Sequence, residues 1–287
     1  MIYLALSIAS SSLLFVLFKL FDRYKVNTLQ AIVVNYVVAF FCGLLYHHSN
    51  VSIADFTNNS WFLGACLLGV LFITIFNVMA ITSQRNGLSV ASVAGKMSVI
   101  VPVIFGIFMY NESVGLQKIF GIVLALFAVY LASVKTKAVF SQKKSMLFPF
   151  LLFIGSGIID TSIKYMENFY VPKKDIALFS ATIFLMAGIL GLLAVGFKAF
   201  KKRFIFDVKS LLGGSFLGVF NYFSIYFLLK ALQVEGFESS TIFTLNNVAT
   251  VMLTTLIGLI LFKETIYTKN WIGIALAIIS ITLVTLA

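Results

Sequence analysis

Apolar runs of about 20 residues recur along the whole chain, and they constrain its fold more than any other feature. A helix of this length crosses the hydrocarbon core of a bilayer, which is about 30 Å thick. Hydrophobic residues make up 61% of the 287 residues and charged residues 11%, too few charges to cover a soluble domain. The sequence therefore predicts an all-α integral membrane protein with almost no soluble mass.

We expect ten apolar runs to span the membrane, five in each half of the chain. A cleaved signal peptide is the rival interpretation of the first run, but the charges Lys19, Arg23 and Lys25 follow that run instead of preceding it. We therefore expect the first run to be retained. The expected spans are residues 2–18, 29–46, 61–82, 89–110, 114–134, 146–166, 176–197, 210–232, 239–262 and 268–286.

A frame of Gly, five residues, Glu, eight residues and Gly occurs near the end of each half. The corresponding members are 152 positions apart (258 − 106, 264 − 112 and 273 − 121), and other Gly, Lys and Gln pairs align at slightly smaller offsets. This pattern indicates an internal repeat. We predict two related five-helix repeats, residues 1–138 and 139–287. The frame consists of Gly106, Glu112 and Gly121 in the first repeat and Gly258, Glu264 and Gly273 in the second.

The membrane topology follows from the odd number of spans in each repeat. The second repeat must enter the membrane from the opposite side, which makes the repeats inverted. Loops after the odd-numbered spans hold about 15 Lys and Arg residues and the others about five, so the first set is expected in the cytoplasm and both termini outside. Because the basic residues lie mostly in these loops, the net charge of +11 predicts no nucleic-acid partner.

This arrangement resembles the drug/metabolite transporter superfamily, and its EamA-type members in particular. The resemblance is carried by residues 91–121, including Pro102, and by the second copy of the frame, where Thr254 stands in place of a proline. It implies a transporter in the bacterial cytoplasmic membrane. In similar proteins a central cavity forms mainly from the first, third, fourth, sixth, eighth and ninth spans. Similar members export amino acids, drugs and other small metabolites, and more distant ones carry nucleotide sugars or triose phosphates.

Two charged residues inside the expected spans are the first candidates for substrate binding. Lys96 lies about two turns into the fourth span and shares a helical face with Ser89 and Ser92. It either holds a carboxylate or phosphate of the substrate or extends its charge to the nearer interface. Asp160 either binds a cationic group or a coupling proton, or forms an ion pair with Lys164 or with Lys96.

Polar and aromatic side chains at helical spacing are the second group of candidates. Amides could hydrogen-bond a zwitterionic or polyhydroxyl solute, and the alternative role is to join helices, at roughly 0.6 kcal/mol per bond. For the two glutamates of the frame, Glu112 and Glu264, capping of a helix start is the expected role. The further candidates for substrate binding are Asn77, Asn221, Tyr222, Tyr226, Asn246 and Asn247.

The sequence as a whole predicts a secondary transporter that exports a small polar metabolite, such as an amino acid or a drug-like solute, by alternating access. It contains no nucleophile elbow, metal-binding His-Glu helix or phosphate loop, so we expect no enzymatic activity, metal or cofactor. The expected partners are a small-molecule substrate and the lipid bilayer, with a monomer or a homodimer both compatible. The alternative is a non-transporting membrane scaffold or a lipid-handling protein on the same fold.

Overall fold

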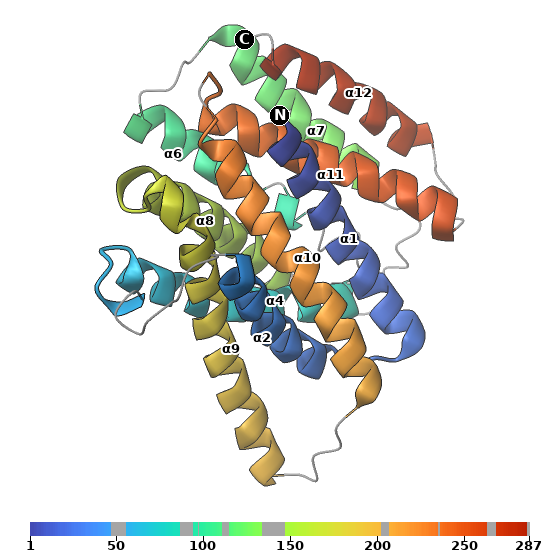
Figure 1. The fold of residues 1–287 in the computed structure, drawn as a ribbon. Coiled ribbons are helices and arrows are strands. Elements are labelled where there is room, and N and C mark those ends of the chain that lie inside the picture. Colours follow the sequence, from blue (N-terminus) through green and yellow to red (C-terminus); the bar gives the residue numbers. More distant parts are fainter. Residues whose placement is uncertain are drawn as a thin grey trace. The chain divides into compact units, whose positions relative to one another are not determined.

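The computed structural model describes residues 1–46, 56–86, 94–96, 98–110, 115–133, 147–201, 207–234, 236–262 and 268–285. Within these ranges the regular structure is helical and contains no strand, in agreement with the all-α prediction. The helices are α1 (Ile2–Tyr24), α2 (Thr28–Tyr46), α4 (Phe62–Asn86), α6 (Ile100–Tyr110), α7 (Leu116–Ser133), α8 (Leu147–Phe169), α9 (Ile176–Lys201), α10 (Val208–Leu232), α11 (Ser239–Phe262) and α12 (Thr268–Thr285), with a 3-10 helix η1 (Lys173–Asp175) before α9 (Figure 1).

Six helices in the described part of the chain are long and apolar enough to cross a membrane. They are α1, α2, α4, α8, α9 and α10. The other four expected spans correspond to shorter apolar stretches, Ala94–Met109, Leu116–Ala128, Thr241–Thr254 and Trp271–Ser280. The protein is therefore a multi-pass membrane protein, and the full count of ten spans stays a prediction.

The packing divides the chain into two compact units, and each unit takes segments from both halves of the sequence. Unit 1 consists of Met1–Asn77 and Ser162–Gln233, and unit 2 of Val78–Thr161 and Val234–Ala287. The boundary predicted between the repeats, at 138 and 139, lies outside the described residues. The two units are defined by packing and not by sequence similarity, so they do not test the two predicted five-helix repeats, which stay a prediction.

Unit 1 is built around close contact between α2 and α10. A Cβ atom on Gly214 would lie 2.6 Å from the main-chain oxygen of Ala31, and one on Gly218 would lie 2.6 Å from that of Asn35. Glycines four residues apart allow two helix backbones to approach this closely. α2 also packs on α9, and α10 packs on α1.

A polar cluster joins the start of α2 to the start of α10. The main-chain N–H of Asn27 donates to Ser210 Oγ at 3.0 Å, and that of Asp207 donates to Gln30 Oε1 at 3.1 Å. Asp207 caps α10 by accepting from the N–H of Lys209 at 3.1 Å. The hydrogen bond from the Ser210 hydroxyl, followed by those from main-chain N–H groups, lowers the pKa of Asp207 below its ordinary value.

Unit 2 contains α7, α11 and α12 packed side by side (Figure 1). Ser280 Oγ of α12 donates to the main-chain oxygen of Gly121 in α7 at 2.7 Å. At the start of α7, Lys118 forms an ion pair with Glu238, the residue before α11, and Lys118 is almost fully buried. These contacts hold the first two turns of α7 against α11 and α12.

Candidate functional site

The predicted fourth span is not one continuous helix in unit 2. Residues 94–96 are helical, Ser98 and Val99 form a turn, and α6 begins at Ile100. The turn is closed by Ser98 Oγ, which donates to the main-chain oxygen of Gly95 at 2.5 Å, and by the N–H of Val101, which donates to the oxygen of Ser98 at 2.9 Å. The span expected over 89–110 therefore contains a turn at Ser98 and Val99, and residues 87–93 and 97 lie outside the described part. We call the turn at Ser98 and Val99 the helix break.

One face of α8 lies directly against the helix break. A Cβ atom on Gly157 would lie 2.6 Å from Val101 Cγ2 and 3.2 Å from the main-chain oxygen of Ser98. Gly157 is buried, and only the absence of a side chain permits this approach. Asp160 follows one turn later on α8, and its charge interacts with that of Lys96.

Lys96 also contacts α11. Its Nζ donates to Asn247 Oδ1 at 3.0 Å. A lysine ammonium has only hydrogens to offer, so the amide oxygen must face it and the Nδ2 group must point away. Asn247 is 4% exposed, and its Nδ2 has no hydrogen-bond partner among the residues that the structure describes. The site thus offers a cation beside a buried and unused amide donor.

The neighbouring Asn246 carries a second unused polar atom. Its Oδ1 is buried and has no partner within the described ranges, although its main-chain oxygen accepts from Thr250 Oγ1 at 2.6 Å. A buried donor or acceptor without a partner costs about 1–3 kcal/mol. The unused polar atoms of Asn246 and Asn247 are therefore each a cost in stability.

A second polar cluster lies in unit 1 on α2 and α10. Asn221 Nδ2 donates to Asn35 Oδ1 at 3.1 Å, so this predicted candidate joins two helices in the structure. Tyr222 is fully buried and its hydroxyl has no partner among the described residues. Tyr226 stacks on Tyr222 with ring centroids 5.8 Å apart and meets the ring of Tyr46 edge-on at 4.8 Å.

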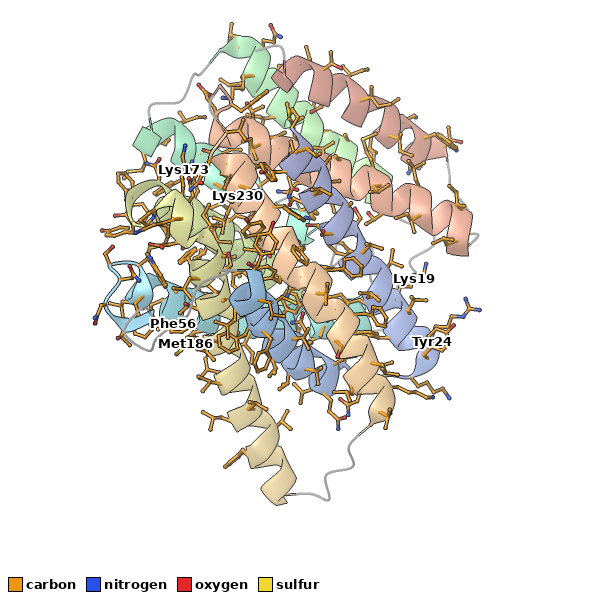
Figure 2. The ribbon with its side chains drawn as sticks, in the orientation of Figure 1. Lys19, Tyr24, Phe56, Lys173, Met186 and Lys230 are labelled. Carbon is orange, nitrogen blue, oxygen red and sulfur yellow. The ribbon has the colours of Figure 1, made fainter. Side chains whose placement is uncertain are left out.

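A lysine completes this aromatic cluster. Lys230, labelled on α10 in Figure 2, places its Nζ 5.8 Å from the centre of the Tyr226 ring. Such a distance allows a cation–π interaction. The aromatic rings of α10 are therefore packed against each other and against a cation of the same helix.

Comparison with known proteins decides the family. Residues 143–286, about half of the chain, match the EamA-like transporter family. The chain belongs to the EamA-like transporter family. It is therefore a membrane transporter of the drug/metabolite superfamily, as the resemblance implied.

Two individual proteins are similar over nearly the full length of this EamA-like protein. An uncharacterised protein of Haemophilus influenzae is 28% identical over 277 residues, which cover 93% of this chain and 91% of the relative. The crystal structure of another protein has a TM-score of 0.70 at 13% identity and covers 98% of both chains. At that identity the second likeness concerns the fold alone.

The remaining predicted residues of this EamA-like protein either pack within helices or lie outside the described residues. Asn77 of α4 donates to the main-chain oxygen of Ile73 in its own helix at 2.7 Å. Three glycines of the frame, Gly106, Gly121 and Gly273, are buried. Gly258 lies in α11, whereas Glu112 and Glu264 lie outside the described residues, so their expected capping role stays a prediction.

Several residues of the site were not predicted from the sequence. Gly157 and the break at Ser98 carried no hydropathy signal, because the apolar run continues through both. Pro102, however, fits the first turn of a helix and not its interior, so it could have indicated that a new helix starts near Ile100. Asn35 was a visible polar residue in an apolar run, but only the structure shows that it bonds Asn221.

Proposed function

We propose that this EamA-like protein is a secondary transporter that exports a small polar metabolite across the bacterial cytoplasmic membrane by alternating access. The observation that carries the proposal is the group formed by Lys96, Asn247 and Asp160 in unit 2. A charged side chain in a membrane span is costly and usually serves a substrate pathway. Here the charge lies at an interrupted helix, the feature around which secondary transporters build their binding sites.

The sequence supports gradient-driven movement and not hydrolysis of a nucleotide. It contains no phosphate-binding loop, and the first apolar run carries no carboxylate for proton coupling. Facilitated diffusion and ion-coupled export therefore both remain within the proposal. The inverted repeats predicted from the frame would provide the two related conformations that alternating access needs.

Solute counterflow in proteoliposomes tests this proposal. Liposomes with the purified protein would be loaded with a panel of unlabelled amino acids, organic acids and cationic amines, and then diluted into trace amounts of the labelled compounds. The proposal predicts transient accumulation of at least one solute, absent from liposomes without protein. The scaffold or lipid-handling alternative would be favoured if no solute of the panel were transported and a lipid or a protein partner stayed bound through purification. The same preparation would show whether the protein is a monomer or a homodimer.

A further inference from the structure

Three exposed basic residues lie where α1 ends and α10 begins, within unit 1. They are Arg23 in the last turn of α1, Lys25 directly after that helix and Lys209 in the first turn of α10. α1 and α10 pack against each other along their length (Figure 1). The three cations therefore belong to one end of this helix pair.

A hydrogen bond fixes two of these lysines close to each other along the backbone. The main-chain N–H of Asn27 donates to Ser210 Oγ at 3.0 Å. Lys25 precedes Asn27 by two residues, and Lys209 is the residue directly before Ser210. Because a lysine side chain is long and flexible, both ammonium groups can reach one ligand from these positions.

The backbone at Lys25 gives this lysine a special place. Its φ is +55°, and it is the one residue other than glycine with a positive φ among the described residues. The N–H of Val26 donates to the main-chain oxygen of Phe21 at 2.9 Å, which is the helix-ending motif that usually places glycine at this position. The chain thus carries a lysine side chain where glycine would suit the backbone better.

The charge at this end of unit 1 is positive. Residues 19–25 and 207–213 contain four Lys or Arg residues and two Asp residues, an excess of two positive charges (4 − 2). The Asp207 carboxylate already accepts from the hydroxyl of Ser210 at 2.9 Å and from the N–H of Lys209 at 3.1 Å. An anion is therefore attracted to this end by a positive field that the acidic residues do not balance.

An exposed apolar stripe leads away from Lys209 along α10. Leu212 and Phe216 follow Lys209 at spacings of three and seven residues, so the three side chains share one helical face. Leu212 and Phe216 are each 60% exposed. At the end of α1, Tyr24 is also exposed (Figure 2), and tyrosine is enriched at the level of lipid headgroups. Cations, an interfacial ring and an apolar stripe match the headgroup and the chains of a phospholipid.

We propose that Arg23, Lys25 and Lys209 bind the phosphate of an anionic phospholipid such as phosphatidylglycerol, whose acyl chains lie along Leu212 and Phe216. The loops after α1 and α9 belong to the set expected in the cytoplasm, and anionic lipids of that leaflet attract basic segments beside a membrane span. The lipid is a bound partner and not the transported solute. It ties the end of α1 to the start of α10.

The test measures thermal unfolding of the delipidated full-length protein in a non-ionic detergent. Phosphatidylglycerol, phosphatidylcholine with the same acyl chains, or inorganic phosphate is added. Because a ligand that binds only the folded protein raises its melting temperature, phosphatidylglycerol should raise it more than the other two. Equal stabilisation by phosphatidylcholine would overturn the role of the negative charge. Equal stabilisation by inorganic phosphate would overturn the lipid as the ligand.

Lys25→Gly separates lipid binding from folding. Glycine suits the positive φ at this position, so the variant without lipid should melt at or above the temperature of the wild type. It should nevertheless bind phosphatidylglycerol about fivefold more weakly, the contribution of one basic residue near an anionic surface. Lys209→Gln should have a similar effect on binding, and the double variant should bind roughly thirtyfold more weakly.

The double variant Lys173→Gln with Lys174→Gln is the matched control, because it also removes two exposed positive charges from unit 1 (Lys173 is labelled in Figure 2). These lysines lie in η1 at the start of α9, whereas α10 follows the end of α9. The 26 residues of α9 span about 39 Å. The control should bind phosphatidylglycerol like the wild type. Equal weakening in both double variants would show attraction by net charge alone and overturn the site, as would undiminished binding in Lys25→Gly with Lys209→Gln.

Discussion

The contact between Gly218 and α2 allows a quantitative prediction for one added methyl group. In Gly218→Ala the new Cβ would lie 2.6 Å from the main-chain oxygen of Asn35 and 2.8 Å from Val38 Cβ. A main-chain oxygen cannot rotate away, so α2 and α10 must separate, at a cost of about 1–3 kcal/mol for overpacking. The separation would also stretch the hydrogen bond between Asn221 and Asn35, worth about 1 kcal/mol.

A gain in helix propensity of up to about 1 kcal/mol partly offsets these losses, because alanine favours a helix over glycine. The expected net loss in free energy of unfolding is therefore about 1–3 kcal/mol. At about 2–4 °C per kcal/mol, the melting temperature should fall by roughly 5 °C. Circular dichroism of the purified protein during heating in detergent measures this directly.

Gly196→Ala in α9 is the matched control. Apart from its chain neighbours and the backbone of its own helix, no heavy atom of the described residues lies within 4 Å of the Cβ position at Gly196, so only the gain in helix propensity remains. This variant should match the wild type or melt slightly higher. Equal melting temperatures for the two variants would show that the helices do not meet as closely as the structure places them.

Three further predictions concern polar contacts. Lys118→Gln should destabilise the protein by about 1–3 kcal/mol. This loss is smaller than that for a fully buried ion pair, because the Glu238 side chain is 37% exposed. In a double-mutant cycle with Glu238→Gln, most of this energy should appear as coupling between the two residues. The hydrogen bond from Ser210 lowers the pKa of Asp207 from 3.8 in the folded protein. The Asp207 carboxylate therefore stabilises the fold above pH 3.8, and this stabilisation is lost as the pH falls through the pKa of the folded state. In acid unfolding curves, the stability difference between wild type and Asp207→Asn should shrink below pH 3.8. Tyr36→Phe removes a hydrogen bond of 3.1 Å to a main-chain oxygen of α4 and should cost about 1 kcal/mol in thermal unfolding, and an unchanged melting temperature would contradict that bond.

Hydropathy predicted the positions of the helices well because burial in a membrane depends mainly on apolar composition. The expected first span ended at residue 18, whereas α1 continues to Tyr24. The added turn contains Lys19 and Arg23, and long basic side chains can extend from a helix end towards water. Composition therefore identified the helix but placed its end too early.

The partners of charged residues were less accessible to sequence reasoning. Lys164 could pair with Asp160 or Glu167, since spacings of four and three residues both bring helical side chains together. In the structure Lys164 Nζ bonds Glu167 Oε2 at 2.8 Å, while the charge of Asp160 interacts with that of Lys96. The choice depends on the packing of α8 against the helix break through Gly157, which periodicity does not encode.

The central claim is that Lys96 binds the solute that this transporter moves. The direct measurement is counterflow of that solute, with its stabilisation of the protein, in wild type, Lys96→Met and the control Lys173→Met. Lys173 is exposed in η1, so its replacement tests the loss of a charge alone. We expect Lys96→Met to remain folded but to lose counterflow and to bind at least about tenfold more weakly, with Lys173→Met unchanged. Undiminished binding and counterflow in a folded Lys96→Met protein would contradict the claim.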